Sequence, residues 1–167
     1  GFIEPLESTS IHLIQQSIIR LMQNMPTKAI EPSFRDDFNA KMRFESENIR
    51  DFIILHYHVT ERTDSPFWQY CKNMSVPDSL KKRIQLFIEN GHVYKGEQEL
   101  FGEPSWLQVM LGQGLLAQNY HPIVDSMSDD ELKHFLISIQ HNVTKKANSL
   151  PNHIEFINRY CRTEQKI

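Results

Sequence analysis

Apolar residues at helical spacing constrain the fold of this chain more than any other feature. In the first segment they recur three and four positions apart, at Ile11, Ile14, Ile18, Leu21, Met22 and Met25. This spacing is typical of an amphipathic helix. Comparable segments follow along the chain, and no stretch alternates apolar and polar residues over a useful strand length. The sequence therefore predicts an all-α fold of irregularly packed helices.

Prolines and capping residues predict where the later helices begin and end. A capping signal at residues 33–36 should start a long helix, continuous or interrupted, that runs to about His56 or Val59. Ser65 and Pro66 should launch a short helix. Further helices are expected over 77–90 (ended by Gly91), over 104–110 (closed by Gly112 and Gly114), from a capping box at 128–131, and from Pro151. Residues 92–103 are expected to be irregular, with one short extended piece at 92–94.

Composition and charge exclude several classes of protein. The chain has 167 residues, of which 40% are hydrophobic and 23% charged, enough for one domain with its own core. Its net charge of −3 and scattered basic residues do not favour nucleic acid, and no apolar run is long enough to span a bilayer. Cys71 and Cys161 have no CxxC spacing, which suits reduced thiols. We therefore expect a cytoplasmic protein that binds neither nucleic acid nor a membrane.

A glutamate stands directly before the first helix. Glu7 precedes three capping candidates, Ser8, Thr9 and Ser10. It should lie at the helix N-terminus, where unpaired N–H groups and a partial positive charge favour an anion. Two interpretations are open on spacing alone. Glu7 complements the helix dipole while Ser8 or Thr9 caps the helix, or its carboxylate has a catalytic purpose beside an anion site.

Three stretches of the chain form distinctive motifs: the opening GFIEPLESTSIHLI, the stretch from His56 to Trp68, and the stretch from Trp106 to Gly114. They resemble, in the same order, motifs of the flavin-dependent tryptophan halogenases. Together they cover most of the chain, which is similar to the C-terminal, helical part that covers the substrate. The resemblance implies one helical domain over residues 1–167, with residues 1–12 at the junction with an N-terminal FAD domain outside this chain. It also implies FAD, reduced by a separate flavin reductase, and no activity of this part alone.

The resemblance implies roles for four residues near the start of the chain. Glu7 would be catalytic, accepting the indole N–H and stabilising positive charge in the transition state. It could instead take the proton from the arenium intermediate or polarise the halogenating species. Thr9 and Ser10 would hold chloride or bromide through backbone N–H groups, and Ile11 would lie beside the flavin ring.

Four further residues are implied to contact the substrate. Phe67 and Trp68 would pack on the substrate ring, because a rigid aromatic slot orients a flat indole. Without the resemblance, this pair at the start of a helix is as readily explained as core filling. His56 and Tyr57 would contact the amino-acid portion of tryptophan, although many relatives have two tyrosines there.

Two positions depart from the family's pattern. Thr63 stands where tryptophan-specific members place a glutamate that receives the substrate ammonium, and threonine carries no charge. This favours a simpler indole, or a larger molecule bearing an indole or phenol, over free tryptophan, although Glu61 or Asp64 could compensate. Ser10 stands where many relatives have glycine. If that position needs a positive φ, serine is strained and halide binding is weakened.

The sequence thus indicates part of an enzyme that chlorinates or brominates tryptophan or another indole with FADH2, O2 and halide, with a homodimer as one candidate assembly. Two other functions stay open: a non-catalytic helical module that binds an aromatic ligand, and part of a flavin monooxygenase that hydroxylates its substrate. The Glu7-Ser8-Thr9 segment argues against the hydroxylase, which needs no halide site. No metal site is predicted, since no third ligand completes the pair His56 and His58.

Overall fold

The computed structural model of this chain describes residues 3, 6–26, 28–94, 96 and 99–162. Every regular element in this part of the chain is a helix, which confirms the predicted all-α fold. The elements, in order, are α1 (Ser10–Gln23), α2 (Pro32–His58), α3 (Pro66–Asn73), α4 (Asp78–Asn90), α5 (Glu103–Gly112), the 3₁₀ helix η1 (Pro122–Ser126), α6 (Asp129–Asn148) and α7 (His153–Tyr160).

The chain forms two compact units. Unit 1 spans Gly1–His121 and holds α1 to α5, whereas unit 2 spans Pro122–Ile167 and holds η1, α6 and α7. The expectation of a single domain over residues 1–167 stays a prediction.

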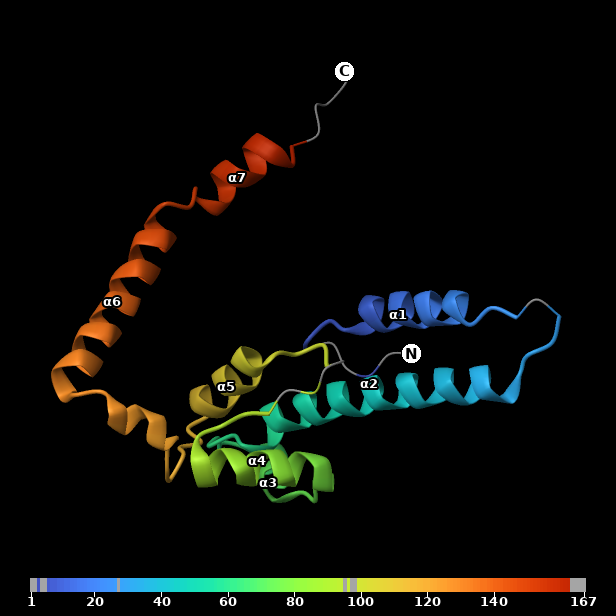
Figure 1. Ribbon diagram of the computed structural model, residues 1–167, viewed down its shortest axis with the longest axis horizontal. Coiled ribbons are helices and arrows are strands. Elements are labelled where there is room, and N and C mark those ends of the chain that lie inside the picture. The colour runs from blue at the N-terminus through green and yellow to red at the C-terminus, as the bar shows by residue number, and fades with distance from the viewer. Residues whose placement is uncertain (1–2, 4–5, 27, 95, 97–98, 163–167) are drawn as a thin grey trace. The chain divides into compact units, whose positions relative to one another are not determined.

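Helix α2 organises unit 1. It contacts α1, α3, α4 and α5. Figure 1 shows α1 running antiparallel beside α2, with α3, α4 and α5 gathered near the C-terminal end of α2. The main core lies at that end. Its buried side chains come from α2, α4, α5 and the loops between them: Phe52, Leu55, Val76, Leu80, Phe87, Val93, Trp106 and Met110.

A buried charge cluster joins α1 to α2. Glu45 on α2 is 3% exposed, and its Oε1 lies 2.7 Å from Nε2 of His12 on α1. Its Oε2 lies 2.6 Å from Nη1 of Arg20, an ion pair without the alignment of a hydrogen bond. A buried carboxylate needs such partners, because removal of a charge from water is costly. The two helices are therefore held in register by charge as well as by apolar packing.

Most helix boundaries agree with the capping signals, and one does not. The capping box at 128–131 is present: the Ser128 hydroxyl accepts the Glu131 N–H, and the Glu131 carboxylate accepts the Ser128 N–H. In α2, however, the helix begins with Pro32 and runs without interruption to His58. The predicted cap at 33–36 is wrong, because proline is already suited to the first turn and Glu31 precedes it without a side-chain cap.

Residues 92–94 belong to no regular element, in line with the irregular segment expected there. Two local features were not anticipated from the sequence. Helix η1 was not expected, and α7 begins with a second capping box, Asn152 with Glu155, that the sequence reasoning did not use. Gly91 ends α4 with a φ of 68°, as predicted for a left-handed cap.

Candidate functional site

The turn before α1 places Thr9 at the N-cap position without a capping hydrogen bond. Thr9 is 3% exposed, and its backbone carbonyl accepts the Leu13 N–H at 2.9 Å. Its side-chain hydroxyl is buried and has no hydrogen-bond partner among the described residues. The simple interpretation of Thr9 as a side-chain cap is therefore wrong. A buried hydroxyl without a partner beside a helix N-terminus suits an anion.

Backbone strain in this turn lies at Ser8, not at Ser10. Ser8 has a φ of 51°, and no other non-glycine residue among those described has a positive φ. Ser10 is the first residue of α1 and is helical. The strain expected for a serine at position 10 is thus absent, because the left-handed turn comes two residues earlier.

Glu7 is paired with His56. The Glu7 Oε1 lies 3.1 Å from His56 Nε2, and the two side chains are 28% and 17% exposed. Two contacts hold His56 in place. Its Nδ1 lies 2.8 Å from the Phe52 carbonyl oxygen, and the Gln113 side chain donates a hydrogen bond to the backbone carbonyl of His56 at 3.2 Å. The carboxylate before α1 is thereby tied to the last turn of α2.

Three aromatic side chains gather at the junction of α2 and α3. The Tyr57 and Trp68 rings are 5.9 Å apart at 16°, and Phe67 meets both rings edge-on at 6.2 and 5.0 Å. A ring placed between two parallel faces needs about 7 Å, twice the ordinary contact distance. Tyr57 and Trp68 therefore stack on each other and leave no room for an indole between them. Only an outer face of this cluster can receive a substrate ring.

The loop between α2 and α3 pairs two of its charged residues with each other. The Arg62 guanidinium binds both Asp64 carboxylate oxygens, at 3.0 and 2.7 Å, and covers the Trp68 ring at 4.4 Å. The hydrogen bond from Arg62 holds the Asp64 pKa below its usual value. Thr63 is exposed, and its carbonyl accepts from Gln69 at 3.4 Å. Glu61 has no ion pair within the described part of the chain.

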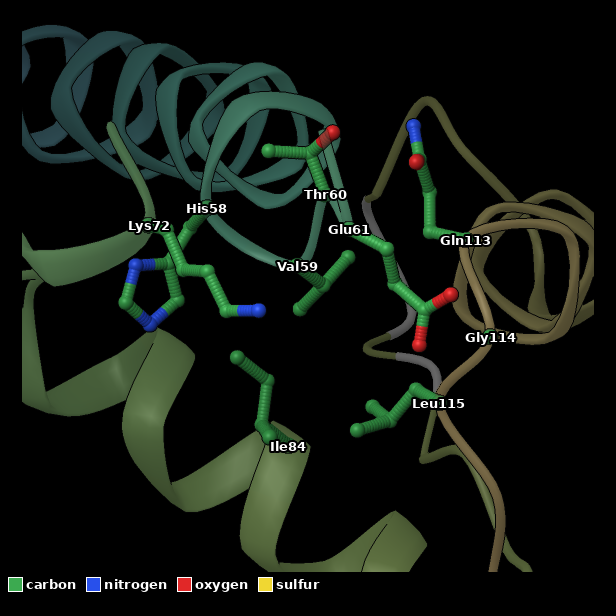
Figure 2. A pocket seen from close by; sticks show the side chains of 9 residues that line it. All are labelled: His58, Val59, Thr60, Glu61, Lys72, Ile84, Gln113, Gly114 and Leu115. Carbon is green, nitrogen blue, oxygen red and sulfur yellow. The ribbon is translucent and has the colours of Figure 1, made fainter. Parts of the chain in front are cut away.

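Behind this loop lies a pocket of about 300 Å³ that none of the predicted site residues lines. Figure 2 shows Glu61 and Lys72 extending into it from different sides, over Val59 and Ile84. Gly114 has a φ of 87°, and a Cβ there would lie 3.0 Å from the Glu61 carboxylate. The remaining lining residues are His58, Thr60, Gln113 and Leu115.

The structure brings together some of the predicted site residues. It pairs Glu7 with His56, and it clusters Tyr57 with Phe67 and Trp68. Thr9, Ser10 and Ile11 are adjacent at the start of α1, where the Ile11 side chain is 70% exposed. The Thr63 carbonyl accepts a hydrogen bond from Gln69, which is not one of the predicted site residues. The substrate, halide and flavin roles stay predictions.

Sequence reasoning missed the contacts that link distant segments. Three features depend on the chain folding back on itself. They are the Glu7–His56 ion pair, the stacking of the Arg62 guanidinium on the Trp68 ring, and the pocket in Figure 2. For Arg62, the signal could have been its spacing from Trp68 across a short loop. For Glu7 and His56, no local signal exists, because the pairing depends on how α1 packs against α2.

Comparisons with known proteins place this chain in a family. The family model described as tryptophan halogenase matches residues 1–129. The solved structure of Xcc4156, a flavin-dependent halogenase from Xanthomonas campestris, is 48% identical with a TM-score of 0.92, and the match covers 98% of this chain and 33% of that one. BrvH, a flavin-dependent halogenase from Brevundimonas sp. BAL3, is 38% identical with a TM-score of 0.90, and the match covers 95% and 32%.

A curated relative agrees with this assignment. KtzR, a 7-chloro-L-tryptophan 6-halogenase from Kutzneria sp. (strain 744), is 26% identical over 167 residues, which cover 95% of this chain and 31% of KtzR. The chain thus spans about a third of the length of these relatives. Since the family model matches well over half of its residues, the chain belongs to the tryptophan halogenase family.

Proposed function

We propose that the protein containing this chain is a flavin-dependent halogenase that chlorinates or brominates the aromatic ring of tryptophan or another indole. Family membership and the similarity to two flavin-dependent halogenases support the proposal. The observation that carries it furthest is the partly exposed Glu7 carboxylate, tied to α2 by His56 at the start of α1. A fixed carboxylate of this kind suits a reaction that develops positive charge on an aromatic ring.

Glu7 is the proposed catalytic residue. Its Oε1 is paired with His56, whereas its Oε2 has no hydrogen bond or ion pair among the described residues. Oε2 is therefore available to accept an indole N–H. Electrophilic substitution makes the ring positive only in the transition state, so the carboxylate stabilises that state more than the bound substrate. Uptake of the ring proton by Glu7 is a further role of the same oxygen.

The start of α1 fits a halide and a flavin. Thr9 contributes a buried hydroxyl without a partner among the described residues, and Thr9 and Ser10 lie where backbone N–H groups favour an anion. The exposed Ile11 side chain is suited to contact with a flat ring. FAD, bound mainly by the rest of the protein and reduced by a separate flavin reductase, would supply the O2-dependent oxidation of chloride or bromide. We assign the junction with that part to residues 1–12.

The substrate is proposed to be an indole that lies against an outer face of the aromatic cluster formed by Tyr57, Phe67 and Trp68. Thr63 offers no charge to a substrate ammonium, and Asp64 is already paired with Arg62. Glu61, the remaining carboxylate in this loop, lines a separate pocket that none of the proposed substrate residues lines. A simpler indole is therefore proposed as the preferred substrate over free tryptophan.

The assembly and location of the protein are further proposals. No helix in the described part of the chain is long and apolar enough to cross a membrane. We propose a cytoplasmic enzyme that meets its flavin reductase transiently, binds no nucleic acid, and has a homodimer as its candidate assembly.

The test uses the full-length protein with FAD, a flavin reductase, NADH, O2 and either bromide or chloride. Free tryptophan, indole and substituted indoles are offered, and products are identified by mass spectrometry. We expect a halogenated indole, and a loss of at least about 100-fold in rate with Glu7→Gln, the size expected when a stabilising group is removed from a transition state. The matched control, Glu47→Gln on the exposed side of α2, should keep the wild-type rate.

Two results would overturn the proposal. Oxygenated products that form without halide would identify a monooxygenase. A complete absence of products, with the flavin reduced and the whole panel tested, would favour a non-catalytic module that binds aromatic ligands.

A further inference from the structure

The hydrogen bond from the His56 ring to the backbone determines which ring nitrogen carries a proton. Nδ1 lies 2.8 Å from the Phe52 carbonyl oxygen, one helical turn earlier in α2. A carbonyl oxygen can only accept a hydrogen bond, so Nδ1 must donate and must carry a hydrogen. In a neutral imidazole the other nitrogen, Nε2, would then have a lone pair and no hydrogen.

Nε2 faces a second acceptor. The Glu7 Oε1 lies 3.1 Å away, and an ionised carboxylate also has no hydrogen to donate. Two lone pairs at this distance repel each other. The contact is attractive when the pair carries one proton, so that an imidazolium faces a carboxylate or a neutral imidazole faces a carboxylic acid.

We propose that Glu7 and His56 share one proton, carried on Nε2 of His56, and that His56 is the positioning residue of Glu7. The ion pair with the imidazolium holds Oε1, which leaves Oε2 available to the substrate. This inference deepens the proposed function and rests on it for the role of Glu7 in halogenation. The shared proton itself rests on the 3.1 Å contact between Oε1 and Nε2 and on the hydrogen bond from Nδ1 to Phe52.

The surroundings of His56 favour a fixed ring. The Phe52 ring meets the imidazole edge-on at 4.8 Å, and Gln113 from the loop after α5 holds the backbone of the same residue. Among the described residues, Glu7 from the segment before α1 is the ionisable group in contact with the ring. Phe52 from α2 and Gln113 contribute only neutral groups. Without the shared proton, two acceptors would be in contact and Glu7 would be released.

The first test detects the protonation state of the His56 ring in the full-length protein without substrate. Ring ¹⁵N NMR of His56 at neutral pH, assigned by comparison with His56→Gln, should show both nitrogens protonated. In Glu7→Gln the side-chain amide can donate to Nε2, so the ring should convert to the neutral form with its hydrogen on Nδ1. A neutral ring in the wild-type protein, or the same spectrum in both proteins, would overturn the shared proton.

The second test measures kcat in three variants. His56→Gln retains a neutral donor, so it should stay within about tenfold of wild type, since charge roughly doubles the strength of a hydrogen bond. His56→Leu should lose about 100-fold, the effect of a misplaced catalytic group, and this loss should be rescued in large part by glutamine at the same position. His58→Gln is the control, because the His58 ring is hydrogen-bonded to the Cys71 carbonyl within the described part of the chain and should keep the wild-type rate.

The two tests separate this inference from the proposed function. A protonated His56 pair in a protein that does not halogenate would support the shared proton and defeat the proposed function. Halogenation at the wild-type rate in His56→Leu would support the proposed function and overturn the positioning role.

Discussion

Gly91 and Gly112 each lie at the end of a helix, and the structure makes different demands on them. Gly91 follows α4 with a φ of 68°, and a Cβ there would lie 3.2 Å from the Asn119 carbonyl oxygen. Gly112 is the last residue of α5, and nothing lies within 4 Å of the place its Cβ would take. The first glycine is therefore required by backbone geometry and crowding, whereas the second is not.

This pair gives a matched stability test. Gly91→Ala should lower the free energy of unfolding of the full-length protein by about 1–2 kcal/mol, because alanine is strained in a left-handed conformation. Gly112→Ala should raise it by up to about 1 kcal/mol, since alanine has the higher helix propensity. Urea denaturation measures both. Equal losses in the two variants would contradict the assignment of the left-handed cap to Gly91.

Asp64 should make the loop before α3 sensitive to acid. The hydrogen bond from Arg62 lowers the Asp64 pKa in the folded protein. The stabilisation from this pair is therefore present above the unfolded pKa and is lost as the pH falls through the lowered folded pKa. Because Arg62 covers Trp68 at 4.4 Å, acidification should shift the indole N–H resonance of Trp68. In Asp64→Asn this titration should disappear, and a shift that persists would assign it to another group.

At the scale of elements, the pairing of α1 with α2 depends on the buried Glu45. Its carboxylate, with a side chain 4% exposed, forms ion pairs with Arg20 and His12 from α1. Glu7 and Thr9 lie directly before α1, and Ser10 is its first residue. A change in the α1–α2 contact is therefore expected to reach the proposed site.

A double-mutant cycle tests this pairing. Arg20→Leu should destabilise the protein by about 3–5 kcal/mol, because it leaves Glu45 buried with its main charge partner removed. The double variant Arg20→Leu/Glu45→Leu should recover most of that loss, because two apolar side chains can replace a buried ion pair. Thermal or urea unfolding of the full-length protein gives the comparison. A double variant as unstable as Arg20→Leu alone would show that packing, and not charge, sets the contact.

At the scale of the molecule, the two units differ in how much they bury. Unit 1 has a contiguous core around α2, whereas no described side chain of η1, α6 or α7 is buried. The predicted apolar face of α6 is exposed at Phe135, Leu136 and Ile139. Helices of this length draw most of their stability from tertiary burial.

A peptide of residues 122–167 should therefore not fold cooperatively by itself. Circular dichroism should show partial helix that melts gradually. Helix content should fall in acid, because the Ser128 N–H lowers the Glu131 pKa and the carboxylate contributes above its unfolded pKa. Glu131→Gln should reduce that acid response. A sharp thermal transition in the wild-type peptide would contradict the absence of a core.

Helix positions were predictable from the sequence because the interactions that set them are local. Apolar spacing identified α1, proline started α3, and the box at 128–131 started α6. The start of α2 was predicted one residue too late, because two adjacent residues carry helix-start signals. The helix begins at Pro32 and not at the capping signal that opens with the next serine. The family was also readable, because its motifs are short stretches of consecutive residues.

The sequence by itself determined the all-α class, the helix order and the residues on which a site could form. Only the tertiary structure decided which of those residues meet. Glu7 and His56 are brought together by the return of α2 along α1, and the side chains of Tyr57 and Trp68 close on each other across the α2–α3 loop. Local propensity acts over a few residues, whereas these contacts depend on the burial of apolar faces between helices far apart in the chain.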